Sequence, residues 1–374
     1  MAKEKLHTPE ELRYLQNLPL KEKVQLSRQR IQEFYEHFDG NVFVSFSGGK
    51  DSTALLHMVR SVYPDVPAVF VNTGLEFPEI QSFARNTDNI TVVRPKMTFK
   101  EVLIQHGYPL ITKSVANGIK QARIFDMEGK GRKRFFTEKM QVWSYKENKM
   151  IRSRFAIECW RPLAEEAPFK ISDRCCYIMK KNATHEYEKE TGRRPIVGTM
   201  AEESLIRENA WLTNGCNAFS RSKGAQSTPM AFWKQNDVLE YIKLMELQIA
   251  SVYGNIVKVP EPNSLDGCKD CALYKTTGLD RTGCIFCGFG AHCEKEYHRF
   301  LNLKETHPKL YDYCIGGGEW VDNPDYDPDM PEYANDGFKN WNPKKLWQPS
   351  KEGLGMGFVF DYINNMPGKA HIPY

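Results

Sequence analysis

A glycine-containing loop between a β-rich run and an amphipathic segment constrains the fold of this chain more than any other feature. Residues 41–46 read Asn-Val-Phe-Val-Ser-Phe, which is typical of a short buried strand. The loop occupies residues 47–52, and residues 52–62 then place apolar side chains at helical spacing. Two more β-rich runs follow at 66–72 and 90–93. This order of elements predicts a βαβ unit, and therefore an α/β fold with a parallel twisted sheet and flanking helices.

The loop, Ser47-Gly48-Gly49-Lys50-Asp51-Ser52, has the residues that an anion-binding turn requires. Its two glycines lack a Cβ atom, so backbone amides can approach a ligand closely. The helix that follows contributes unpaired N–H groups and a partial positive charge. Lys50 adds a cation, and the two serines add hydroxyl donors. The arrangement suits a pyrophosphate, although the spacing is not that of a Walker A loop; the alternative is a glycine-rich turn whose polar residues are incidental.

Two segments resemble the PP-loop ATP pyrophosphatases. Residues 45–57 resemble the PP-loop itself, and residues 72–79 (Asn-Thr-Gly-Leu-Glu-Phe-Pro-Glu) resemble a second-strand motif of the ATP sulfurylase small subunit and the phosphoadenosine phosphosulfate (PAPS) reductases. The resemblance implies an adenine-nucleotide alpha-hydrolase-like fold that binds ATP with Mg²⁺ on its phosphates. It implies that residues 47–52 bind the nucleotide, that Lys50 and Asp51 are catalytic, and that Asn72, Thr73 and Gly74 line the pocket. Asn72 stands where family members usually have Asp, which keeps a hydrogen bond and removes a charge.

Further motifs of the family follow in order along the chain. Residues 196–207 resemble a Gly-x-Arg-x-x-Glu-Ser-x-x-Arg stretch, which implies that Glu203, Ser204 and Arg207 also bind the nucleotide. Residues 228–233 and 237–242 resemble a Pro-Leu-x-x-Trp and an Asp-Val-x-x-Tyr-Ile stretch. The resemblance covers about residues 40–300.

Ten cysteines form the second group of candidate site residues. Structural disulfides are rare in a cytosolic chain, so their spacing points to metal or redox chemistry. The Cys175-Cys176 pair and the Cys284-x-x-Cys287 pair resemble those of adenosine phosphosulfate (APS) reductases and of the DNA-phosphorothioation PP-loop protein. In those relatives four thiolates hold a [4Fe-4S] cluster. The resemblance implies the same ligands here: Cys175, Cys176, Cys284 and Cys287.

Zinc is the alternative metal. Cys268-x2-Cys271-x12-Cys284-x2-Cys287 has nearly the spacing of a zinc ribbon. That assignment leaves the Cys175-Cys176 pair unexplained, whereas the iron–sulfur assignment leaves Cys268 and Cys271 without a role.

Three departures from the reductase pattern favour a reaction that consumes ATP. No cysteine follows Cys314, whereas sulfonucleotide reductases carry a nucleophilic cysteine in a C-terminal motif; the loop at 47–52 is intact; and Met200 replaces an Arg that reductases commonly use. We therefore expect an ATP-dependent, pyrophosphate-releasing iron–sulfur sulfurtransferase, in which the cluster thiolates deliver or hold sulfur taken from a donor protein or a small thiol. The alternatives are an APS or PAPS reductase that uses an external thiol, and a non-catalytic nucleotide-sensing or nucleic-acid-binding module.

A basic segment at 130–154 suggests a nucleic-acid acceptor. It contains nine Lys or Arg residues and two Glu, together with several aromatic side chains, although the whole chain of 374 residues has a net charge of only +4. Phosphate contacts and base stacking would suit such a segment, and a solvated lid surface explains it equally well.

The remaining expectations concern class and organisation. With 41% hydrophobic and 26% charged residues, no membrane-length apolar run and no secretory signal at the first residues, we expect a cytoplasmic protein without a membrane role. The expected domains are N-terminal helices at 1–40, a nucleotide-binding domain at 41–250 with a basic insertion at about 113–160, a Cys-rich metal-binding region at 251–315 and an irregular tail at 316–374. The sequence does not indicate an oligomeric state.

Overall fold

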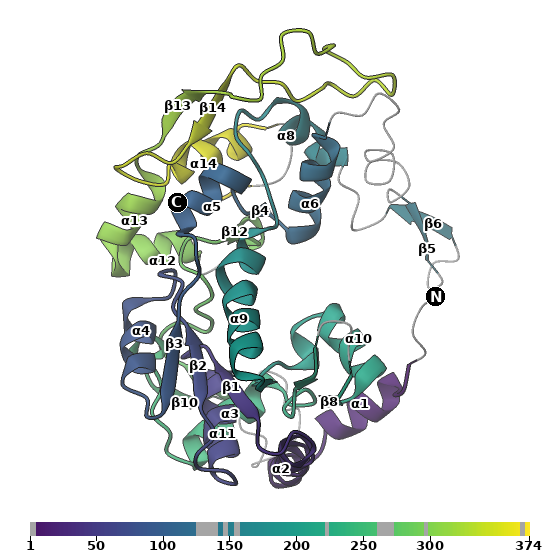
Figure 1. Cartoon of the computed structure of the whole chain (residues 1–374), viewed down its shortest axis with the longest axis vertical. Coiled ribbons are helices and arrows are strands. Elements are labelled where there is room, and N and C mark those ends of the chain that lie inside the picture. Colours follow the sequence, from purple (N-terminus) through teal and green to yellow (C-terminus); the bar gives the residue numbers. More distant parts are fainter. Residues whose placement is uncertain are drawn as a thin grey trace. The chain divides into compact units, whose positions relative to one another are not determined.

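The computed structural model describes residues 5–124, 141–144, 149–152, 158–220, 224–259, 273–294, 298–366 and 371–374. The chain divides into two compact units (Figure 1). Unit 1 comprises Met1–Pro95 and Lys180–Gly283, and unit 2 comprises Lys96–Met179 and Cys284–Tyr374. Each unit is therefore built from two separated stretches of chain, whereas the domains expected from the sequence were continuous.

A six-stranded sheet forms the centre of unit 1, with the order β3-β2-β1-β7-β9-β8. Its strands are β1 Val42–Phe46, β2 Ala68–Val71, β3 Ile90–Val93, β7 Arg194–Val197, β8 Asn217–Ala218 and β9 Gln226–Ser227. All neighbours pair in parallel except β8 and β9, which confirms the predicted parallel α/β fold. The central strand β1 is covered on both faces, because Val42, Phe43 and Val44 are fully buried.

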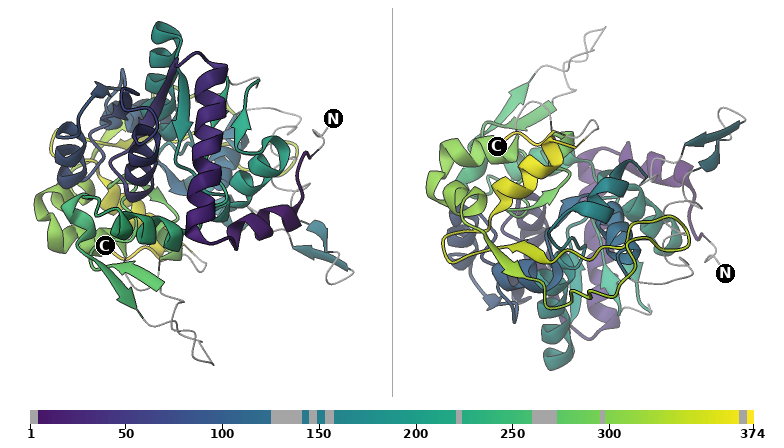
Figure 2. Two further views of the ribbon diagram at one scale, coloured as in Figure 1. Left: turned by 90° about the horizontal axis from the view of Figure 1, so that it is seen from below. Right: turned by 90° about the horizontal axis from the view of Figure 1, so that it is seen from above.

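Helices flank this sheet (Figure 2). They are α1 Pro9–Gln16, α2 Leu20–His37, α3 Lys50–Arg60, α4 Pro78–Arg85, α9 Asn182–Thr191, α10 Leu205–Asn214 and α11 Gln235–Leu244. Two short strands, β10 Ile256–Val259 and β11 Leu273–Thr276, pair antiparallel, and single turns occur at Ala201–Glu203 and Ser251–Tyr253. Pro19 separates α1 from α2, since a proline inside a helix removes a hydrogen bond and clashes with the preceding turn.

Unit 2 is mainly helical. Its helices are α5 Phe99–His106, α6 Lys113–Ala122, α8 Arg161–Glu166, α12 Arg299–Thr306, α13 Pro308–Ile315 and α14 Met356–Asn364, with single turns at Glu158–Trp160 and Ala291–Cys293. Short strand pairs join β4 Leu110–Ile111 to β12 Gly288–Phe289, β5 Gln141–Ser144 to β6 Lys149–Arg152, and β13 Glu319–Asp322 to β14 Lys345–Gln348. A π-helical turn at Tyr177–Lys181 ends at the start of α9.

The prediction of an irregular tail at 316–374 is wrong. The β13–β14 hairpin and α14 lie within it, and Met356, Val359 and Phe360 of α14 are fully buried. The sequence hid this packing because a long Pro- and Asp-rich connection separates the two strands, so no short window shows both partners.

The segment expected as an insertion at 113–160 begins with a regular helix. Helix α6 buries Val115, Ala116, Ile119 and Ala122 on one face. Much of the basic segment at 130–154 lies outside the described residues, as do Cys268 and Cys271. Among the helices that the structure describes, none combines the length and the apolar character needed to span a membrane.

Candidate functional site

The predicted loop lies where β1 passes into α3, as the sequence indicated. β1 ends at Phe46 and α3 begins at Lys50, with Gly49 as the N-cap residue and no side chain capping it. Gly48 has a φ of 71°, and a Cβ atom there would lie 2.9 Å from Cγ2 of Ile80 on α4. Glycine is therefore required at this position both by the backbone conformation and by the close approach of α4.

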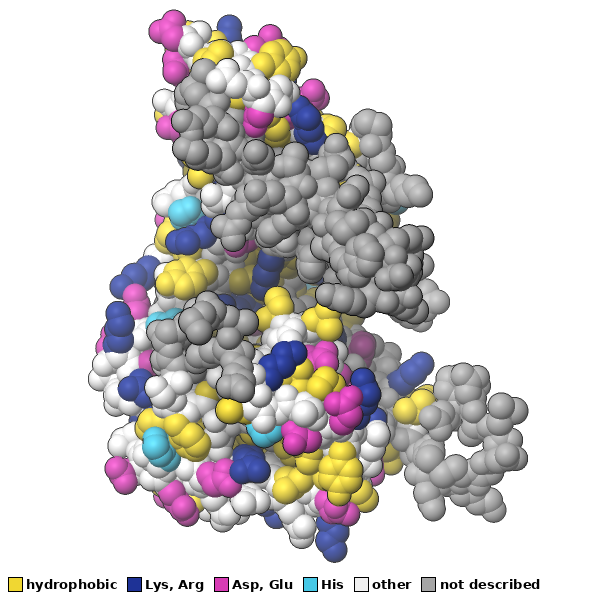
Figure 3. All heavy atoms as spheres, turned by 90° about the vertical axis from the view of Figure 1, so that its right-hand side faces the viewer, with side chains coloured by type: hydrophobic (Ala, Val, Ile, Leu, Met, Phe, Trp, Pro, Cys, Tyr) yellow, Lys and Arg dark blue, Asp and Glu magenta, His cyan; other side chains and the backbone are white. Residues whose placement is uncertain are grey.

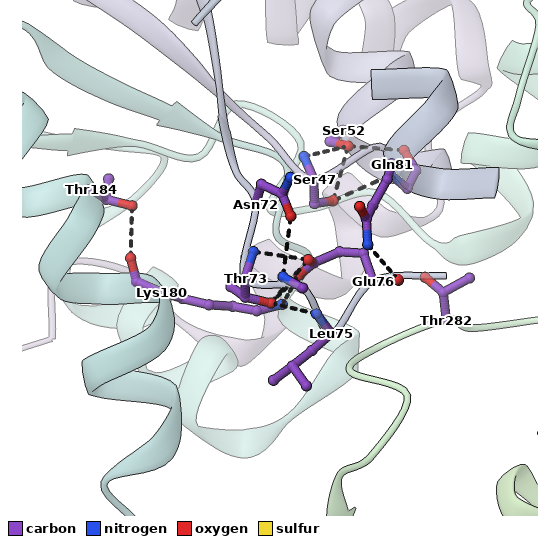
Figure 4. Close-up of polar contacts among 12 residues, drawn as sticks. Ser47, Ser52, Asn72, Thr73, Leu75, Glu76, Gln81, Lys180, Thr184 and Thr282 are labelled. Carbon is purple, nitrogen blue, oxygen red and sulfur yellow. Dashed lines mark hydrogen bonds and ion pairs between the residues drawn. The ribbon is translucent and has the colours of Figure 1, made fainter. Parts of the chain in front are cut away.

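Two serines fix the shape of the loop. The Ser52 hydroxyl accepts a hydrogen bond from the backbone N–H of Ser47 (3.2 Å) and donates one to the carbonyl of Gly49 (2.9 Å). The hydroxyls of Ser47 and Ser52 are 3.0 Å apart, and the two residues meet in Figure 4. Because Ser52 is buried and already bonded, its main contribution is to hold the loop closed.

A second loop follows β2, where the sequence placed part of the nucleotide site. The Asn72 side chain accepts the N–H of Gly74 (3.1 Å), and the Glu76 carboxylate accepts both the N–H and the hydroxyl of Thr73. Lys180 extends to Glu76, with Nζ 3.5 Å from Oε1 (Figure 4). Local hydrogen bonds and the ion pair with Lys180 therefore hold the second loop.

A pocket of about 400 Å³ opens beside the first loop, entirely within unit 1. Eight charged side chains line it, and cations and carboxylates are equal in number. They are Lys50, Lys180, Arg207 and Arg281 together with Asp51, Glu76, Glu203 and Asp280. A larger pocket of unit 1, lined partly by Trp211 and Phe219, contains none of the predicted site residues. The smaller pocket is the better candidate site because charged groups and loop amides converge on it.

Each cation that lines this pocket is paired with a carboxylate that also lines it. Nζ of Lys50 is 3.2 Å from Oδ1 of Asp280 and lies over the ring of Tyr253, 5.2 Å from its centroid. Glu203 pairs with Arg207 and also with Arg281, whose Nη1 is 3.5 Å from Oε1. The pocket therefore holds four positive groups in a nearly neutral setting.

Asp51 is a pocket carboxylate whose burial opposes its ionisation. Burial raises the pKa of the Asp51 carboxyl, while the nearby cations Lys50, Arg281 and Arg207 act in the opposite direction. A partly buried carboxyl with a raised pKa that lies near several cations can accept a proton during a reaction.

The four predicted cluster cysteines all belong to unit 2 and influence one another. The pKa of the Cys175 thiol is raised by its hydrogen bond with Cys176, by burial, and by the nearness of Cys284 and Cys287. Burial also raises the pKa of the Cys287 thiol, which the backbone N–H of Phe289 and the Arg299 guanidinium partly offset. The structure thus brings the two sequence-distant pairs into one neighbourhood, which we call the thiol group.

The thiol group has the donors of a metal centre, although its side chains are not arranged as ligands. Across the described ranges, no three His, Cys, Asp or Glu side chains are placed so that they could hold a metal ion together. None of the eight described cysteines forms a disulfide. Four thiols, with an N–H directed at one sulfur, fit the chemistry of an iron–sulfur cluster.

The comparison with protein families confirms the resemblance for one part of the chain. Residues 41–115 match the family model described as the phosphoadenosine phosphosulfate reductase domain. This part of the chain is therefore similar to the PAPS reductase domain. The matched residues include both loops, at 47–52 and 72–76, whereas Glu203, Arg207 and all ten cysteines lie outside them.

Relatives extend the PAPS reductase likeness along the chain. The APS reductase of Staphylococcus saprophyticus is 21% identical over 274 residues, which are 72% of this chain and 90% of that enzyme. An uncharacterized protein of Methanocaldococcus jannaschii is 28% identical over 78% of this chain. The PAPS reductase of Xanthomonas euvesicatoria is 32% identical over 84 residues, which are 21% of this chain. The chain spans 50% of the length of the Methanocaldococcus protein and 35% of the Xanthomonas enzyme.

The structure brings some of the predicted nucleotide-binding residues to the pocket and not others. Those that line it are Ser47, Gly49, Lys50, Asp51, Glu203 and Arg207. Gly48 and Ser52 shape the first loop, while Asn72, Thr73 and Gly74 shape the second loop. Ser204 is exposed and caps α10 by accepting the N–H of Arg207.

Several pocket residues were missed by the sequence analysis. They are Glu76, Lys180, Gln235, Tyr253, Asp280, Arg281 and Thr282. Asp280, Arg281 and Thr282 come just before the Gly283-Cys284 motif, and Lys180 follows the Cys175-Cys176 pair by four positions. The closeness of these four residues to the cysteine motifs could have indicated them in the sequence. Tyr253 lies near none of the motifs, so the sequence did not indicate it.

Proposed function

We propose that the chain is an ATP-dependent enzyme that forms pyrophosphate and transfers sulfur to an acceptor. The observation that carries the proposal is the intact loop at 47–52, which directs Lys50 and the start of α3 toward a pocket with three further cations. Two linked phosphates need several charge-assisted donors at once, and helix N-termini supply them efficiently.

The reaction that suits this pocket is attack on the α-phosphorus of ATP. An acceptor oxygen forms the new P–O bond, the bond between the α-phosphorus and the α–β bridging oxygen breaks, and pyrophosphate leaves with both electrons of that bond. Lys50, Arg207 and Arg281 would stabilise the charge that develops on the leaving group, and Asp51 would take the acceptor's proton. Mg²⁺ bound to the phosphates would neutralise part of their charge.

A hydrosulfide-level nucleophile (HS⁻ or its equivalent, supplied by the donor) then completes the transfer. It attacks the activated carbon of the acceptor, the C–O bond breaks, and AMP leaves. Adenylation makes that oxygen a good leaving group, which is the reason to spend ATP on the step. We propose a protein or a small thiol as the sulfur donor.

A nucleic acid is one candidate acceptor, because residues 130–154 are rich in Lys and Arg. On the face shown in Figure 3, described Lys and Arg side chains are interspersed with Asp and Glu.

We include a [4Fe-4S] cluster in the proposal, held by Cys175, Cys176, Cys284 and Cys287. The support is the shared neighbourhood of these four thiols, the N–H of Phe289 beside Cys287, and the donation by Arg299 Nη1 to the Cys287 carbonyl (2.9 Å). A cluster supplies redox or sulfur-binding chemistry when it is bound.

Reduction of APS or PAPS is the second candidate, and the names of the relatives favour it. In that reaction a thiolate attacks the sulfur of the sulfonucleotide, the nucleotide phosphate leaves, and a second thiol releases sulfite. The same pocket could bind the sulfonucleotide, since its cations suit any phosphorylated adenosine.

One pair of assays separates the two candidates. Protein purified without oxygen is incubated with ATP and candidate acceptors, and pyrophosphate is measured; a parallel sample receives APS or PAPS with thioredoxin, and sulfite is measured. We expect acceptor-dependent pyrophosphate and no catalytic sulfite. Catalytic sulfite release without pyrophosphate formation would replace the sulfurtransferase by the reductase.

A further inference from the structure

Residues 280–282 cross the pocket of unit 1 and are fixed there by three separate contacts. Asp280 pairs with Lys50 and also accepts a hydrogen bond from Nε2 of Gln235. Arg281 pairs with Glu203. The hydroxyl of Thr282 is 3.1 Å from that of Tyr253. Successive side chains thus attach to three different parts of the pocket wall, so the segment is held in place rather than passing over the pocket by chance.

The pairing of Lys50 with Asp280 is asymmetric. Lys50 is 5% exposed, whereas the Asp280 side chain is 67% exposed. The ammonium group is therefore enclosed by the protein, and the carboxylate reaches it from the solvent side. An anionic ligand that pairs with the Lys50 ammonium group must compete with the Asp280 carboxylate for it.

We propose that Asp280 is a specificity-determining residue, which acts as an internal competitor for the phosphate position on Lys50. The inference rests on the proposed function only in taking the pocket as a phosphate site. A ligand gains the Lys50 contact only after it displaces the Asp280 carboxylate. Its apparent affinity is therefore the intrinsic affinity multiplied by the fraction of molecules in which the Lys50–Asp280 pair is open. A ligand that does not reach Lys50 bears no such cost. Asp280 therefore weakens every polyphosphate by one common factor and leaves the nucleoside part unaffected.

Asp280→Asn is the sharpest test because the amide keeps the size of the side chain and its bond with Gln235 while removing the charge. Binding of inorganic pyrophosphate, ATP and adenosine is measured by calorimetry in the full-length protein. Because the carboxylate is largely solvated, we expect pyrophosphate and ATP to bind about two- to fivefold more tightly to the variant. Adenosine should bind with unchanged affinity.

The Lys50→Gln variant tests whether Asp280 acts through Lys50. If Asp280 acts through Lys50, adding Asp280→Asn to Lys50→Gln produces no further gain for pyrophosphate. Glu202→Gln is the matched control, since Glu202 is a nearby carboxylate that accepts the N–H of Gln235 and does not line the pocket. It should leave all three affinities unchanged, and thermal unfolding without ligand confirms that every variant is folded.

Three results would overturn the inference: weaker or unchanged pyrophosphate binding in Asp280→Asn, an equal gain for adenosine, or a gain that persists in the Lys50→Gln background. Failure of the proposed function is seen separately, because it is read from pyrophosphate formation in a turnover assay. A protein that binds pyrophosphate in the expected pattern and forms none from ATP would keep Asp280 as the competitor and lose the sulfurtransferase.

Discussion

The pocket of unit 1 and the thiol group of unit 2 differ in how their ionisable side chains are paired. In the pocket, each lining cation is paired with a carboxylate, so the site is almost neutral as it stands. In the thiol group, four cysteine side chains lie near one another. Cys176, Cys284 and Cys287 each raise the pKa of the Cys175 thiol and so favour its protonated form. The first site supplies its own counterions, whereas in the second the Arg299 guanidinium offsets only part of the effect of burial on the Cys287 thiol.

This difference indicates what each site requires of a ligand. An anion that enters the pocket replaces a carboxylate as the partner of a lining cation, so the net charge around that cation changes little. A metal centre entering the thiol group replaces protons, so its binding releases protons and depends on pH. The following predictions test that contrast.

Removing the pocket cation should have the largest effect. Lys50→Gln and Asp51→Asn should each lower acceptor-dependent pyrophosphate formation by about 10²–10³-fold, because one preorganised charge contact in a buried site contributes that much. Lys21→Gln, an exposed lysine at the start of α2, is the control. Turnover within about twofold of wild type in both variants would show that the loop does not bind the reacting phosphates.

Removing a thiol should come next. Cys284→Ser should lower iron and acid-labile sulfide at least about tenfold in protein purified without oxygen, since even an indirect change near a metal costs that much affinity. Cys293→Ser, an exposed cysteine of the same unit, should keep full metal content.

The metal identity is decided by the same measurement. Stoichiometric zinc without iron in wild-type protein would favour the ribbon that uses Cys268 and Cys271, and would remove the iron–sulfur cluster from the proposed function.

Substitution of two glycines in the loops of unit 1 should distinguish the effect of packing on stability from the effect of backbone conformation. Gly48 and Gly74 have φ values of 71° and 74°, yet a Cβ atom at Gly48 meets Ile80 at 2.9 Å and one at Gly74 meets nothing within 4 Å. Alanine at either position should cost about 1–2 kcal/mol for the left-handed backbone. Gly48→Ala should cost about 1–3 kcal/mol more. Chemical denaturation measures both, and equal losses would contradict the close approach of α4.

The smallest expected effect is a pH dependence in unit 1. Burial raises the pKa of the Cys216 thiol from 9.0 to about 11. The unfolded chain therefore ionises this thiol first, so the stabilising contribution is complete below about pH 9 and is lost as pH rises toward 11. By pH 10 the loss should be about 1.4 kcal/mol.

Denaturation of wild type and Cys216→Ala at pH 7 and pH 10 checks this contribution. The variant should lose less stability on alkalinisation, whereas Cys159→Ala, which alters an exposed thiol, should follow the wild type. Parallel losses in all three proteins would assign the alkaline effect to other groups.

Local motifs were readable from the sequence, and assembled contacts were not. The strand, loop and helix around residues 42–60 were predicted because three independent signals, β-rich run, glycines and helical spacing, lie side by side. Lys180 and Asp280 were missed because their roles depend on partners more than 100 positions away. The hairpin of β13 and β14 was missed because a long connection between Asp322 and Lys345 separates its two strands.

The order of strands in the sheet also has a consequence for synthesis on the ribosome. Strand β1 lies between β2 and β7, and about 100 residues, including the first stretch of unit 2, separate β3 from the end of β7. At about 5–20 residues per second, translation of that interval takes roughly 5–20 s. During this time the apolar edge of β1 that later pairs with β7 has no partner strand, and open edges of this kind recruit other chains. The growing polypeptide therefore passes through a period in which chaperones should protect it, and slower decoding between residues 96 and 179 should prolong that exposure.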